Sequence, residues 1–70
     1  MNNELSERIF IEELLSGIEK EIKQMGIGLA NGNASTLEDY RYKVGIIKGL
    51  QKSIDIIEES YKQYLNDDND

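Results

Sequence analysis

The amino-acid sequence predicts an all-α fold: one domain over residues 1–70, built as an antiparallel two-helix hairpin and completed by self-association or by docking on a larger assembly. Apolar residues recur at three- and four-residue intervals, proline is absent, and a glycine- and asparagine-rich segment interrupts the period. One core in a 70-residue chain contributes only modestly to stability. Because cysteine and histidine are also absent, neither a disulfide nor the commonest metal ligand adds to it. Association is the expected source of further buried apolar surface.

The first predicted helix covers about residues 4–25. Its apolar residues form one stripe, while Leu5 and Ile9 fall on the opposite side. The stripe consists of Ile11, Leu14, Leu15, Ile18, Ile22 and Met25. Glu4 and Arg8 have the spacing of an ion pair along the helix surface.

The segment 26–35 breaks the apolar period and is predicted to be the loop that connects the helices. Its glycines and asparagines supply backbone conformations with positive φ. Gly26 and Gly28 do not indicate a phosphate-binding loop, because no strand precedes them, the third glycine is missing and no Gly-Lys-Ser/Thr is present.

The second predicted helix covers about residues 36–65. Ser35 and Glu38 have the spacing of a capping box, in which each side chain binds a backbone N–H of the first turn. Thr36 with Asp39 is an alternative frame one residue later. The acidic residues in this first turn also suit the positive end of the helix dipole.

Two apolar stripes are predicted on the second helix. The first is a heptad-like seam that packs on the first helix, and it consists of Tyr40, Val44, Ile47, Leu50, Ile54, Ile57, Tyr61 and Tyr64. The other lies roughly opposite on a helical wheel of 100° per residue, so the hairpin alone leaves it facing water. It is the predicted protein interface and consists of Tyr42, Gly45, Ile46, Gly49, Ser53, Ile56 and Ser60.

The two glycines of the second stripe are its most informative residues. A glycine inside a helix costs about 1 kcal/mol relative to alanine, so keeping both predicts a use for the missing side chains. Gly45, Gly49 and Ser53 form a row of small residues at four-residue spacing, which lets another helix approach closely. The alternative is that one glycine accommodates a bulky residue of the first helix.

Composition and spacing disfavour several functional classes. Fourteen acidic and 8 basic residues give a net charge of −6, which disfavours nucleic acid and anionic membranes as partners. No apolar run approaches the ~20 residues that span a bilayer. The adjacent carboxylates at 12–13 and 58–59 point about 100° apart on a helix and do not converge. We expect no enzymatic activity, no catalytic residue, no cofactor, no metal and no small-molecule substrate.

The acidic tail, residues 66–70, is predicted to fray, because its carboxylates oppose the helix dipole. Residues 67–70 lack the glycine and the terminal glutamate of a calcium-binding loop.

Basic residues cluster in the first half of the second helix, whereas the first helix is rich in glutamate. Charge complementarity between helices or subunits explains this pattern. The alternative is a DNA-binding dimer that uses Arg41, Lys48 and Lys52. The predicted loop is too long for the tight turn of a helix-turn-helix motif, so that motif does not support it.

One stretch of the second helix resembles a known group of proteins. It reads Asp39-Tyr40-Arg41-Tyr42-Lys43-Val44-Gly45-Ile46-Ile47-Lys48-Gly49-Leu50. It resembles the core of short, mostly uncharacterised helical proteins of tailed bacteriophages, whose helix-loop-helix layout covers nearly the whole chain. The resemblance implies a structural or assembly component of a phage particle, which we expect in the virion or the host cytoplasm. The second apolar stripe leads us to expect a homo-oligomer or an assembly subunit. The net charge leaves open another function, a small acidic inhibitor or DNA mimic that binds a host nucleic-acid-binding protein.

Overall fold

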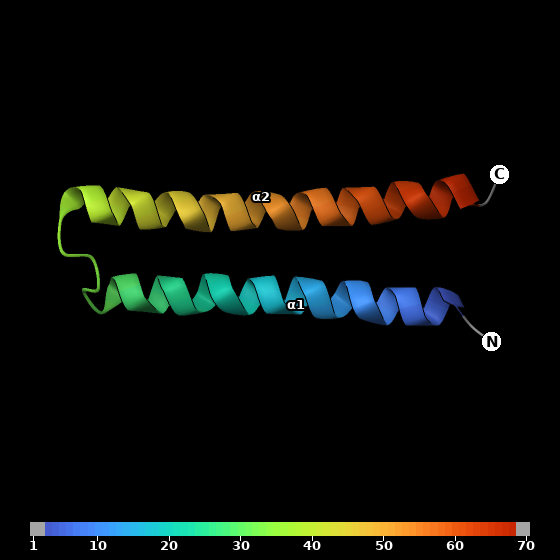
Figure 1. Cartoon of the computed structure of the whole chain (residues 1–70), viewed down its shortest axis with the longest axis horizontal. Coiled ribbons are helices and arrows are strands. Elements are labelled where there is room, and N and C mark those ends of the chain that lie inside the picture. The colour runs from blue at the N-terminus through green and yellow to red at the C-terminus, as the bar shows by residue number, and fades with distance from the viewer. Residues whose placement is uncertain (1–2, 69–70) are drawn as a thin grey trace.

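The computed structural model describes residues 3–68 and consists of two antiparallel helices joined by a short turn (Figure 1). Helix α1 spans Asn3–Ala30 and helix α2 spans Leu37–Asp68. The predicted all-α hairpin is therefore confirmed. The molecule is a flat rod of 51 × 20 × 10 Å, in which the first turns of α1 lie beside the last turns of α2 (Figure 1).

The helices meet along a seam of half-buried apolar residues that are three or four positions apart, as in a coiled coil. On α1 these residues are Ile11, Leu15, Ile18, Ile22, Met25 and Leu29. On α2 the central residues of the seam are Ile47, Leu50, Ile54, Ile57, Tyr61 and Leu65. Tyr40 and Tyr64, which the periodicity places in the seam, are exposed at its edges.

No residue in the described part of the chain is fully buried. Two helices shield each other on one side only, so even the seam residues remain partly exposed to water. The packing that determines the hairpin therefore leaves the chain without an enclosed core.

The predicted loop, residues 26–35, is wrong in its first half, because α1 continues to Ala30. Leu29 follows Met25 by four residues and extends the half-buried seam by another turn. Burial of this side chain outweighs the helix cost of two neighbouring glycines. The connection is therefore shorter than predicted and covers residues 31–36.

Gly32 ends α1 in a left-handed conformation with φ of 82°. Its N–H donates to the Leu29 carbonyl at 3.1 Å, and the Asn33 N–H donates to the Gly28 carbonyl at 3.0 Å. This pair of bonds is a Schellman motif, which satisfies the last carbonyls of the helix. The side-chain nitrogen Nδ2 of Asn33 also lies 2.9 Å from where a Cβ on Gly28 would stand. The missing side chain of Gly28 therefore leaves space for Asn33 in the turn.

Thr36 is the N-cap of α2. Its Oγ1 accepts a hydrogen bond from the Asp39 N–H at 3.0 Å, while Asp39 Oδ2 accepts one from the Ser35 N–H at 3.2 Å. The Thr36 frame is thus the one adopted, and the prediction that Ser35 caps the helix with Glu38 is wrong. The one-residue shift lets a single carboxylate satisfy the backbone N–H before the cap.

Lys43 fastens the turn to α2. Its ammonium donates to the Asn33 carbonyl at 2.9 Å and lies 3.1 Å from Asp39 Oδ2. The hydrogen bond from Lys43, followed by that from the Ser35 N–H, lowers the pKa of the Asp39 carboxyl below its ordinary value of 3.8. Lys43 therefore stabilises the turn next to the N-terminus of its own helix, α2.

Two predictions about the outer ends of the helices are wrong. The acidic tail does not begin at residue 66, because residues 66–68 continue α2. Residues 69–70 lie outside the described part. In α1, Arg8 Nε pairs with Glu12 Oε2 at 3.6 Å rather than with Glu4.

Candidate functional site

One long flank of the hairpin carries exposed apolar and small residues from both helices. We call it the glycine face, and it consists of Phe10, Leu14 and Gly17 of α1 together with Tyr42, Gly45, Ile46, Gly49, Ser53, Ile56 and Ser60 of α2. Steps of three, four and seven residues keep each set on one side of its helix.

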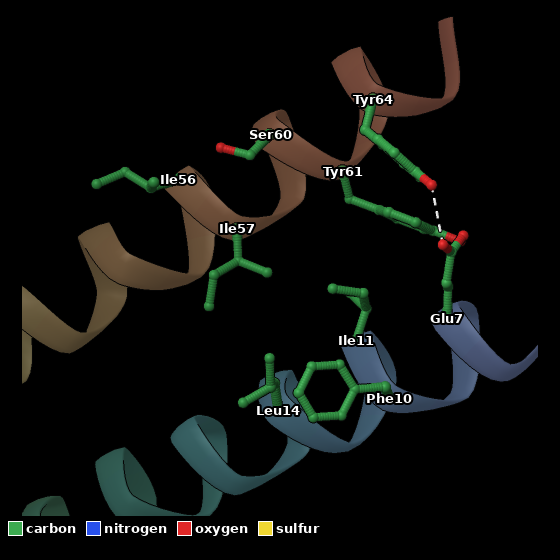
Figure 2. Close-up of a pocket in the computed structure, with 9 residues that line it drawn as sticks. All are labelled: Glu7, Phe10, Ile11, Leu14, Ile56, Ile57, Ser60, Tyr61 and Tyr64. Carbon is green, nitrogen blue, oxygen red and sulfur yellow. Dashed lines mark hydrogen bonds between the residues drawn. The ribbon is translucent and has the colours of Figure 1, made fainter. Parts of the chain in front are cut away.

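An open groove forms the end of the glycine face that is remote from the turn (Figure 2). Its volume is about 400 Å³. The groove is lined by Glu7, Phe10, Ile11, Leu14, Ile56, Ile57, Ser60, Tyr61 and Tyr64. Phe10 is 62% exposed and Ile56 is 55% exposed, although such side chains gain about 1.5–3 kcal/mol from complete burial. The groove is therefore an apolar surface without a cover in the hairpin.

A polar contact closes the outer end of this groove. The Tyr64 hydroxyl donates a hydrogen bond to Glu7 Oε2 at 2.9 Å, which joins α2 to α1 (Figure 2). The Tyr61 and Tyr64 rings stack, with centroids 6.4 Å apart. Further in, Ile57 points toward α1 and Ile11 points toward α2 (Figure 2), so the floor of the groove is the seam itself.

At the centre of the glycine face, packing within the hairpin does not require glycine. Gly45 and Gly49 are exposed, and a Cβ added to either would meet nothing within 4 Å. The alternative that one of them accommodates a bulky residue of the first helix is therefore wrong. Gly17, which is not among the predicted interface residues, is equally open. Its spacing of three from Leu14 is the signal in the sequence that indicates it.

The predicted interface stripe lies beside the seam rather than opposite it. Ile46 and Ser53 are half-buried at the edge of the seam, whereas Tyr42 is 68% exposed. The other residues of the stripe are exposed: Gly45, Gly49, Ile56 and Ser60. The seam is centred nearer to Leu50 and Ile57 than the wheel predicted, so it is rotated toward this stripe. As a result, α1 and α2 contribute to one continuous surface.

Ser53 is the polar residue in the middle of the row of small side chains. Its hydroxyl donates to the Gly49 carbonyl of the same helix at 2.9 Å. Burying an unpaired hydroxyl costs free energy, but this donor already has a partner within α2. The row can therefore be covered by an apolar surface without leaving that donor unsatisfied.

The glycine face differs in charge from the outer side of α2. From Tyr42 to Ser60 its α2 residues are all uncharged. The outer side of the same helix instead carries the exposed charges Arg41, Lys48, Lys52, Asp55 and Glu59. The three basic residues considered for DNA binding are thus followed along the same side by two carboxylates, which limits the length of a positive surface.

The described residues offer little else to a ligand. Within residues 3–68, no three acidic side chains gather in a way that could hold a metal ion. Neither helix, over its described length, is both long and apolar enough to cross a membrane. Comparisons of the chain with models of protein families, with curated proteins and with solved structures gave no match.

Proposed function

We propose that this chain is a non-enzymatic interaction protein that acts through helix–helix packing, as a small structural or assembly component of a phage particle. The observation that carries the proposal is the glycine face, a flank whose α2 residues are uncharged and which combines an open apolar groove with exposed glycines. The phage context is supported by the resemblance at residues 39–50. In this role the hairpin occupies the virion or the host cytoplasm.

The physical case is that the glycine face gains more from a protein partner than from water. Phe10 and Ile56 project apolar surface into solvent, and each 100 Å² removed from water contributes about 2.5 kcal/mol. Exposed apolar surface that is contiguous and bordered by charged residues is typical of protein interfaces. Beside these anchors, glycines allow a partner's backbone to approach closely and add dispersion contacts.

Purified particles test this proposal directly. Wild-type chain should be detected in particles by immunoblot, and Ile56→Glu should be lost from them, because it places a charge in the groove. Gln51→Glu adds the same charge on the outer side of α2 and should be retained. Circular dichroism of each purified variant verifies the helical fold. Absence of the wild-type chain from particles and from assembly intermediates would contradict the proposal.

A second candidate is an acidic inhibitor of a nucleic-acid-binding protein, which the net charge of −6 favours. The outer side of α1 exposes several carboxylates, although Lys20 and Lys23 interrupt them. Capture of such an enzyme should then weaken steeply with salt. It should be lost when Glu12 and Glu13 are both changed to lysine, while Ile56→Glu should have no effect. The two candidates thus depend on different faces of the hairpin.

A further inference from the structure

Five residues of the α2 part of the glycine face are arranged symmetrically about Gly49, whereas Ile46 and Ser60 are not, since their counterparts are Lys52 and Glu38. Small residues, Gly45 and Ser53, lie four positions before and after it, and large residues, Tyr42 and Ile56, lie seven positions before and after it. Steps of four and seven stay on one side of a helix. The row therefore has the same sequence of large, small, small, small and large side chains in either direction.

Such a row is complementary to an antiparallel copy of itself. A two-fold axis at Gly49 would set Tyr42 against the partner's Ile56 and Gly45 against the partner's Ser53. In a two-fold interface each contact occurs twice with the roles exchanged. Large side chains at both ends would then flank a central crossing of small ones, where the two backbones approach closely.

We propose that the occupant of the glycine face is a second copy of this chain, bound antiparallel through α2 about a two-fold axis at Gly49. This inference rests on the proposed function and specifies its partner. The apolar groove next to Ile56 extends the contact, since Tyr42 of the other copy reaches that end of the face.

The surface area of the hairpin supports a dimer. The chain exposes 5678 Å², whereas a compact monomer of 8.0 kDa exposes about 4,450 Å². The excess is roughly 1,200 Å², and a standard interface buries about 800 Å² per partner. One such interface would bring each chain close to the exposure of an ordinary globular domain. It would also bury side chains, whereas none of the described residues is buried in the single chain.

Charge restricts where two copies can meet. Each chain carries a net charge of −6, so two copies repel each other, and a contact surface without like charges adds least to that repulsion. The α2 residues of the glycine face are uncharged, and Ser53 already donates within its own helix at 2.9 Å. On the back of α1, by contrast, the exposed Ile9 and Ile27 lie five turns apart with Glu13 and Lys20 between them. That side offers no comparable surface to a second copy.

The mass of the full chain in solution is the first test. Sedimentation equilibrium should give twice the 8.0 kDa of one chain. Gly49→Leu should weaken dimerisation by more than about tenfold, because the side chain fills the crossing. Gly26→Leu is the matched control, since that glycine is equally open but lies on another flank; it should leave the dimer intact. A wild-type monomer, or a dimer indifferent to Gly49→Leu, overturns the inference.

Disulfide cross-linking tests the antiparallel arrangement. Because the chain contains no cysteine, only the introduced thiols can form a disulfide. Tyr42→Cys and Ile56→Cys replace exposed side chains, so both variants should fold. When they are mixed and oxidised, the disulfide between positions 42 and 56 should predominate over bonds between identical positions. Leu37→Cys, exposed on another flank, should not cross-link with either. Predominant bonds between identical positions overturn the two-fold geometry.

The particle assay separates failure of this inference from failure of the proposed function. A monomeric chain that still enters particles, and is lost from them as Ile56→Glu, overturns the second copy as the occupant while the proposed function stands. A cross-linked dimer whose wild-type form is absent from particles and from assembly intermediates supports the inference and overturns the proposed function.

Discussion

The two ends of the rod are stabilised in different ways. At the turn, short polar contacts connect the two helix ends: Thr36 caps α2, Gly32 ends α1, and Lys43 joins the Asn33 carbonyl to Asp39. At the far end, an open apolar groove lies between the helices, and Phe10 is 62% exposed. The polar contacts of the turn are all made within one chain, whereas the far end has exposed apolar surface that another molecule could cover.

The largest expected effect comes from the backbone of the turn. Gly32→Val should lower the free energy of unfolding by about 2 kcal/mol, because a β-branched residue is strained at positive φ. Urea denaturation followed by circular dichroism measures the change. Gly32→Asn is the control, since asparagine tolerates this conformation better, and it should cost clearly less. Equal losses for the two variants would mean that the left-handed turn is not required.

Loss of the helix cap should have the next largest effect. Thr36→Ala removes the acceptor of the Asp39 N–H and should destabilise the hairpin by about 1 kcal/mol. Thr36→Ser retains the hydroxyl and should remain near wild-type stability in the same denaturation experiment. If both variants unfold like wild type, the cap contributes nothing and the contrast between the ends weakens.

Alanine on the glycine face should have the opposite sign. Gly17 is exposed with nothing within 4 Å of an added Cβ, so Gly17→Ala should raise the free energy of unfolding by about 0.5–1 kcal/mol. Denaturation at low protein concentration isolates the stability of the single hairpin. A loss of stability would show that this glycine is already in contact with another part of the chain.

The smallest expected effect is a dependence of stability on pH. The pKa of Asp39 is lowered by Lys43 and by the Ser35 N–H, so its carboxylate favours the folded state. That contribution is fully present above the unfolded pKa of 3.8 and is lost as the pH falls through the lower folded value. Asp39→Asn should flatten the acid side of the stability curve in this range. An unchanged acid limb would contradict the role of this carboxylate.

The sequence predicted the hairpin well because packing on one side of each helix leaves a strong period. The seam from Ile11 to Met25 follows from spacing, except that Leu14, which was predicted to lie in it, is exposed in the groove. The structure lengthens the seam to Leu29. The end of α1 was misplaced because local glycine cost favoured a loop at residues 26–30, while burial of Leu29 favoured helix. Such a contest depends on the partner helix, which single-residue propensity does not describe.

The candidate face was predicted only on α2. The row from Gly45 to Ser53 is visible in one helix, but the groove also needs Phe10, and its location depends on how α1 is rotated against α2. The wheel placed the seam too far from Ile46, so the stripe was expected on the opposite side. Rotation of a few tens of degrees is set by side-chain packing, which spacing in one helix does not determine.

The short connection between the helices also determines which chain fills each seam. The seam residues of α1 and α2 recur at a regular spacing, so α2 of another molecule could pack on α1 through the same apolar residues. A connection that covers only residues 31–36 holds the chain's own α2 at an effective concentration in the millimolar range. Pairing within the chain therefore outcompetes exchange between chains at lower concentrations. The short turn thus lowers the entropic cost of pairing α1 with α2 of the same chain. The seam is then occupied within the hairpin, and the flank is the surface that remains for association.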